Sequence, residues 1–213
     1  AKGPSHRMSA EMIRDNALKV SGLLVPKIGG KSVYPYQPSG LWDLSDKSWR
    51  YRYQHDKDEN LYRRSLYTFW KRSAPPPSML IFDTPNRDLC SVKRTLTSSP
   101  LQALLLLNDP QFIEAARVMA ENSILSKEKS INKKLSTLFR EIIGRTIRDG
   151  ELEILLRFYN EEKEKFSKNQ SKAIAYLKTG EKPMNSDIEV VNMAALATVI
   201  SGMMNTAEAI TIN

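Results

Sequence analysis

The spacing of apolar residues divides the chain into two halves near residue 98. Beyond that point, apolar side chains recur at the three- and four-residue intervals that place them on one face of a helix. Proline follows a capping residue at Ser99 and again at Asp109, as it does in the first turn of many helices. The C-terminal half is therefore predicted to be a bundle of five or six helices, over residues 99–107, 109–123, 130–143, 150–167, 169–178 and, after a capping box at Ser186 and Glu189, to about 203.

The N-terminal half has a different pattern. Ser9 followed by apolar residues at helical spacing predicts one helix over residues 9–21. Residues 22–60 contain prolines and a pair of glycines that exclude long regular structure, yet they are rich in tyrosine and tryptophan. We expect this segment to be a long loop packed on the surface of the domain.

Residues 61–98 give the least regular pattern. Weak alternation over residues 65–70, with aromatic and β-branched side chains, favours a short strand, and a helix is the open alternative. Residues 92–96 could pair with it, and a short helix is expected over residues 78–82. The predicted fold is mainly α, a single domain over residues 1–213 with a helical bundle, an irregular aromatic N-terminal half and a small two-stranded β element.

Composition narrows the class of protein. The chain has 213 residues, 41% of them hydrophobic, which suits a globular fold, and no apolar run of about 20 residues that could span a bilayer. A single cysteine, Cys90, excludes an internal disulfide, and the common local motifs for haem, zinc and nucleotides are absent. We expect neither a metal nor a cofactor. Because the chain starts at Ala1 without a signal peptide, we expect a fragment or a processed product.

The net charge of +8 lies entirely in the first half of the chain. Residues 1–100 carry 17 Lys and Arg against 9 Asp and Glu, and residues 101–213 carry 15 of each. A one-sided positive field attracts anionic ligands, although such charge also serves solubility. Nucleic acid is a less favoured partner, because no recognised nucleic-acid motif accompanies the basic and aromatic residues.

The candidate chemistry lies in the irregular segment. Arginine side chains there could hold a carboxylate, sulfate or phosphate in a bidentate way, or could tie the segment together through internal aspartates such as Asp109. Cys90 lies beside two cations, which could activate its thiol, but a buried packing role is favoured. His55 is expected to be solvated. The ligand-binding candidates are Arg63, Arg64, Arg72, Asp83, Asp88, Arg94 and Asn108.

Four segments resemble the C-terminal domain of unknown function of planctomycete-type surface proteins. They are MSAEMIRDNALKVSGLL at 8–24, YRRSLYTFWKRSAPPPSMLIFDTPNRDLC at 62–90, RTLTSSPLQALLLLNDPQFIEAARVMA at 94–120 and MMNTAEAITIN at 203–213. Residues 127–185 fit least well. The resemblance supplies no agreed catalytic residues. It adds Arg14 and Asp15 to the motif positions that match, and the others are Arg63, Arg72, Asp83, Arg94 and Asn108.

The resemblance implies a cellular context. Such proteins carry a secretion signal, another domain of unknown function and often a c-type cytochrome domain, so the expected location is periplasmic or on the cell surface, with sister domains as partners. The leading hypothesis is an interaction or anionic-ligand module, with a sulfated or acidic glycan as one ligand. The alternatives are a saccharide-acting hydrolase, with Asp83 or Asp88 as acid/base, and a docking domain for a redox partner.

Overall fold

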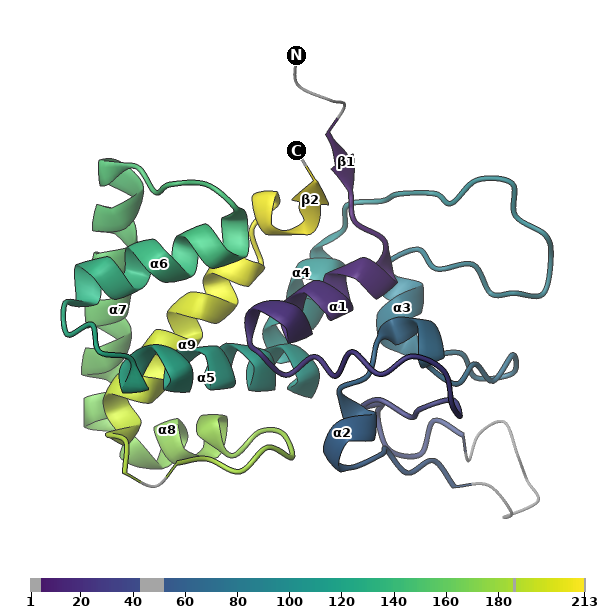
Figure 1. Ribbon diagram of the computed structural model, residues 1–213, viewed down its shortest axis with the longest axis horizontal. Coiled ribbons are helices and arrows are strands. Elements are labelled where there is room, and N and C mark those ends of the chain that lie inside the picture. The colour runs from purple at the N-terminus through teal and green to yellow at the C-terminus, as the bar shows by residue number, and fades with distance from the viewer. Residues whose placement is uncertain (1–4, 43–51, 186, 213) are drawn as a thin grey trace.

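The computed structural model describes residues 5–42, 52–185 and 187–212, and its helices form two packed groups that share one helix (Figure 1). The shared helix is α5 (Pro110–Leu125), whose Asp109 cap accepts a hydrogen bond from the Gln111 amide. The helices of the C-terminal group pack around α9 (Val190–Met204), which is buried along most of its length. The other members of that group are α6 (Ile131–Ile143), α7 (Asp149–Lys168) and α8 (Gln170–Leu177).

The second group forms around the first helix of the chain. Helix α1 (Ala10–Val20) begins at Ser9, whose hydroxyl accepts a hydrogen bond from the Met12 amide, and it packs on α5. Helix α4 (Pro100–Asn108) also packs on α5 and begins at the predicted Ser99 cap. Two short helices complete the group, α2 (Asp58–Leu61) and α3 (Pro77–Ile81).

The mainly helical fold is confirmed, and the six longer helices after residue 98 match their predicted ranges within one or two residues at most boundaries. Helix α6 ends at Gly144, which adopts the left-handed conformation with φ of 82° that favours glycine at this position. Ser186 lies outside the described residues, and Glu189 caps α9 without a side-chain hydrogen bond. None of the helices in the described part of the chain is both long and apolar enough to cross a membrane.

The two-stranded sheet forms between other segments than those predicted. Residues 65–67 form a 3₁₀ turn, η1 (Ser65–Tyr67), and residues 92–96 are irregular, so the predicted strand pair is wrong. The antiparallel pair instead joins β1 (His6–Arg7) to β2 (Thr211–Ile212), which follows the 3₁₀ turn η2 (Glu208–Ile210). Figure 1 shows this pair bringing the two ends of the described chain together.

The aromatic loop packs on the N-terminal group, as predicted, over its described residues. Parallel bridges join Val25 to Arg63 and Val33 to Thr68, so residues 25–33 run beside residues 63–68. Tyr34 stacks on Phe69 with ring centroids 5.1 Å apart. Residues 43–51 of this loop lie outside the described residues.

Candidate functional site

Two of the predicted arginines are buried and hold the irregular segment together. Arg14 is 5% exposed, and its guanidinium donates to the Gln111 side chain at 2.6 Å and to the carbonyl oxygens of Leu61 and Arg63 at 2.8 and 2.7 Å. Burial lowers the pKa of Arg14 to about 10, which leaves it charged at neutral pH. Arg14 therefore links α1 to the end of α2 and to the residues that follow it.

Arg63 is 2% exposed and fills the inside of a tight loop. Its guanidinium donates to the carbonyl oxygens of Lys27, Gly29 and Lys31, and it lies 4.1 Å from the centroid of the Tyr67 ring. Three of the five N–H donors of this guanidinium are used by carbonyl oxygens, and its burial keeps the remaining donors, including Nε, away from an external carboxylate or sulfate. The partners of Arg63 therefore all lie within the fold.

The more exposed predicted residues have partners within the fold. Arg94 pairs with Glu11 through contacts of 2.7 and 3.0 Å, and Arg64 lies 3.4 Å from Asp15. Asp83 accepts hydrogen bonds from the amide and hydroxyl of Thr97, both at 2.8 Å. Each of these groups is therefore engaged with a neighbour in the fold.

The remaining predicted residues do not join them. Arg72 and Asp88 are exposed, and Asn108 donates to the Leu104 carbonyl at 2.8 Å at the end of α4. Cys90 is exposed as a free thiol, so the prediction of a buried packing role is wrong. Among the described residues, the contacts given above do not join Arg63, Arg72 and Arg94 to one another or to Asp83 and Asp88.

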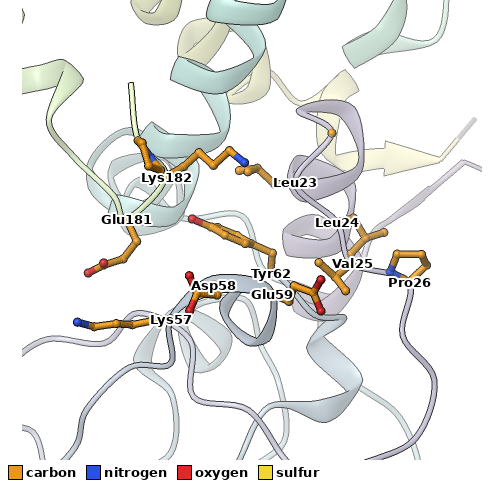
Figure 2. Close-up of a pocket in the computed structure, with 12 residues that line it drawn as sticks. Leu23, Leu24, Val25, Pro26, Lys57, Asp58, Glu59, Tyr62, Glu181 and Lys182 are labelled. Atoms are coloured by element: carbon orange, nitrogen blue, oxygen red, sulfur yellow. The ribbon is translucent and has the colours of Figure 1, made fainter. Parts of the chain in front are cut away.

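A pocket of about 600 Å³ forms at a place that the sequence did not indicate. It lies where three distant segments meet, namely the chain after α1, the start of α2 and the connection between α8 and α9. In Figure 2, residues 24–26 form one side of the pocket, Lys57 and Glu181 lie on the other, and Tyr62 lies between them. The full lining is Gly22, Leu23, Leu24, Val25, Pro26, Lys57, Asp58, Glu59, Tyr62, Glu181, Lys182 and Pro183.

The buried carboxylate of Glu114, on α5, contacts two residues that line this pocket, Tyr62 and Lys182. Glu114 is fully buried. One of its oxygens accepts from the Tyr62 hydroxyl at 2.9 Å and from the Lys182 amide at 2.6 Å, and the other accepts from the Tyr36 hydroxyl at 3.1 Å. Three hydrogen bonds to one carboxylate offset most of the free-energy cost of burying its charge. Glu114 thereby fixes the relative positions of three separate segments.

Arg117 completes the buried network one turn further along α5. Its guanidinium lies 3.8 Å from Glu114, 3.5 Å from Glu121, and donates to the Lys182 carbonyl at 2.6 Å. The connection between α8 and α9 also approaches the network closely at Gly180. This residue has φ of 98°, and a Cβ here would overlap the Glu114 carboxyl group. The amide and the carbonyl group of Lys182 therefore both fix this edge of the pocket to α5.

Tyrosines and a histidine form the outer part of the network. Burial, followed by the negative charge of Glu114, raises the pKa of Tyr36 and of Tyr62, so both hydroxyls remain donors. Tyr36 in turn accepts from the Glu181 amide at 2.8 Å. The His55 ring lies 5.1 Å from the Tyr36 ring and 2.8 Å from the Glu181 carboxylate, and its side chain is 35% exposed, so this partly solvated histidine also has partners in the fold.

The sequence contained one signal for this network. Glu114 and Arg117 are charged residues three positions apart in a helix whose other nearby positions are apolar, and such residues are rarely fully buried without partners. The partners themselves could not be found, because Tyr36, Tyr62 and Lys182 lie far away along the chain. Across residues 5–42, 52–185 and 187–212, no group of three or more histidine, cysteine or acidic side chains is placed to hold a metal ion.

The chain was compared with protein families, curated proteins and solved structures. No curated protein and no solved structure is significantly similar to the chain. A family model described as "Protein of unknown function (DUF1553)", PSD1, matches residues 1–159, which include α1 to α6 and all the sequence-predicted site residues. The match agrees with the resemblance found in the sequence, and the chain belongs to this DUF1553 family of unknown function.

Proposed function

We propose that the chain is a binding module that takes a saccharide unit with an anionic substituent, such as a sulfate or a carboxylate, in the pocket above Tyr62. The observation that carries the proposal is the make-up of this pocket. Its lining combines apolar side chains with two lysines and three carboxylates, in a volume of about 600 Å³. A pocket of that size, with apolar walls and a few polar groups, is typical of ligand sites.

The two kinds of lining side chain suit the two kinds of group on a sugar ring. The apolar wall of Leu24, Val25 and Pro26 suits the C–H face of a saccharide, and carboxylates such as those of Asp58 and Glu59 suit its hydroxyl groups as acceptors. A free cation is needed to hold an anionic substituent, because a charge-assisted contact is stronger than a neutral one.

Lys57 and Lys182 supply such cations. Neither lysine forms an ion pair with a carboxylate in the described part of the chain. The Lys182 backbone is fixed on both sides by Glu114 and Arg117, so its side chain leaves from a defined position. The excess of positive charge in residues 1–100 adds a favourable field for an anionic ligand.

The test compares dextran sulfate with dextran, which share a backbone and differ in charge. Titration calorimetry at two salt concentrations should show binding of dextran sulfate that weakens with salt. The double variant Lys57→Gln/Lys182→Gln should weaken it about fivefold, as two exposed ion pairs predict. The matched control is Lys163→Gln/Lys172→Gln, which removes the same charge from exposed lysines of α7 and α8. Equal binding of both polymers, or equal loss in both variants, would refute the proposal.

A saccharide-acting hydrolase is a second candidate, with different residues from those the sequence suggested. The pocket gathers the carboxylates of Asp58, Glu59 and Glu181, and hydrolysis of a glycosidic bond needs two carboxyl groups beside the ligand. Release of reducing ends from the bound polysaccharide, and its loss in Glu59→Gln, would support catalysis. Binding without release of reducing ends would leave a binding module alone.

A further inference from the structure

Residues 26–32 form an exposed loop whose backbone is fixed from the inside of the fold. The buried Arg63 guanidinium donates to three carbonyl oxygens of this loop. The Tyr67 hydroxyl accepts a hydrogen bond from the Gly29 amide at 2.8 Å. The side chains of the loop therefore leave an ordered backbone, and they leave it toward solvent.

Two aliphatic side chains lie uncovered in this part of the surface. Ile28, in the loop, is 90% exposed, and Leu66, in η1, is 70% exposed. The loop and η1 are neighbours, because both lie between the two parallel bridges that join residues 25–33 to residues 63–68. The fold thus holds two apolar side chains in water on adjacent segments of ordered backbone.

The charged side chains of these segments are all cationic. Residues 23–33 and 60–82 contain no Asp or Glu. Lys27 and Lys31 are exposed, and neither forms an ion pair within residues 5–42, 52–185 and 187–212. Arg64, beside Leu66, has a side chain that is 58% exposed. The surface around the two aliphatic side chains therefore favours an anionic partner.

Carboxylates from other segments do not cancel this charge. Asp15 lies 3.4 Å from Arg64, but its own side chain is only 18% exposed and it also lies 3.8 Å from the buried Arg14. Asp58 and Glu59 line the pocket together with Pro26, at the start of the loop. The two lysines of the loop remain available to an external anion.

We propose that the loop and η1 dock on the surface of an anionic phospholipid membrane. The two aliphatic side chains enter the interface, and the three cations contact the lipid phosphate groups. A lipid surface deforms around separate aliphatic side chains, whereas a folded protein needs a matching hollow for each, and an acidic polysaccharide offers no apolar phase. The inference is independent of the saccharide pocket, because none of these five residues lines it.

Sedimentation with lipid vesicles tests the proposal. The chain should bind vesicles of mixed phosphatidylcholine and phosphatidylglycerol, more weakly as salt is raised, and should not bind phosphatidylcholine alone. The variant Lys27→Gln/Lys31→Gln should weaken binding about thirtyfold. The matched control Lys163→Gln/Lys172→Gln, which removes the same charge from exposed lysines of α7 and α8, should weaken it far less.

A second pair of variants tests the aliphatic side chains, because cations alone would attract any anionic surface. Ile28→Ser/Leu66→Ser should weaken binding to the mixed vesicles by at least about tenfold. The matched control Leu125→Ser/Ile154→Ser, at positions on α5 and α7 that are each 57% exposed, should bind like the unmodified chain. All four residues are exposed, so circular dichroism should show the same helical content in both variants.

An environment-sensitive dye reports whether the loop enters the lipid. In a Cys90→Ser background, which removes the exposed thiol, the dye on Ile28→Cys should shift to the blue with mixed vesicles, and the dye on Ile154→Cys should not. No binding to mixed vesicles, unchanged binding of Ile28→Ser/Leu66→Ser, or an unshifted dye at position 28 would overturn the proposal. Binding to polyglutamate without binding to vesicles would overturn it as well.

Discussion

Removing the Glu114 carboxylate should destabilise the fold far more than removing any exposed glutamate. In Glu114→Ala, the hydroxyls of Tyr36 and Tyr62 and the amide of Lys182 all lose their acceptor. Hydrogen bonds to a charged group contribute about 1.5 kcal/mol each or more, so three give a loss of about 4–5 kcal/mol. That loss is a large share of the roughly 5–15 kcal/mol that typically stabilises a domain.

The variant Glu114→Gln separates the charge from the shape. Glutamine keeps the volume and one acceptor oxygen, but it leaves the buried Arg117 guanidinium with only Glu121 as a charged partner. Arg117 also keeps its bond to the Lys182 carbonyl, so the cost should be smaller, about 2 kcal/mol.

Urea unfolding, followed by circular dichroism, measures both losses, provided that the m value is unchanged. The control is Glu161→Ala on α7, an exposed residue whose ion-pair partner, Arg157, lies 4.0 Å away, and it should cost less than about 0.5 kcal/mol. A loss below about 1 kcal/mol for Glu114→Ala would refute the view that this carboxylate holds three segments together.

Three further predictions concern other parts of the network and the fold. Arg63→Met should lower the free energy of unfolding by about 2–3 kcal/mol, because three carbonyl oxygens lose a charged donor, and it should speed tryptic cleavage in residues 26–32. The loss is smaller than for Glu114→Ala because these carbonyl groups belong to exposed residues, where water can replace the donor. Arg145 lowers the pKa of Glu151 to about 2, so the stability it gives is present above the unfolded pKa near 4.5 and is lost as pH falls toward 2. Arg145→Gln should therefore flatten the acid limb of the stability curve measured by urea unfolding. Tyr62→Phe should leave the tyrosinate absorbance gained near pH 10 unchanged, because burial raises the pKa of Tyr62.

The helices could be predicted from the sequence because their signals are local. Capping residues, prolines in the first turn and apolar spacing all lie within a few positions of each other, as at Ser99 and Asp109. The conformation of residues 65–70, which form no strand, could not be predicted from local signals. Their alternation was weak, and their backbone is set by distant partners, since Arg14 binds the Arg63 carbonyl and Asp15 accepts from the Ser65 amide.

The terminal strand pair and the pocket were beyond local signals for the same reason. Each strand has only two residues, and the partners are separated by nearly the whole chain. The pocket joins segments near residues 24, 58 and 182, and no spacing rule connects them. The basic residues of the irregular segment were predicted to bind a ligand, but the Arg63 side chain lies inside the fold and donates to backbone carbonyl groups.

Amide hydrogen exchange at Lys182 tests most directly whether the pocket is a built site. Its amide donates to the buried Glu114 carboxylate, although the Lys182 residue itself is exposed in a connection between two helices. The network predicts that this amide exchanges orders of magnitude more slowly than an unprotected amide, and that Glu114→Gln speeds its exchange. Exchange of the Lys182 amide at the rate of an unstructured loop would show that the rim is not held and that the pocket has no fixed shape.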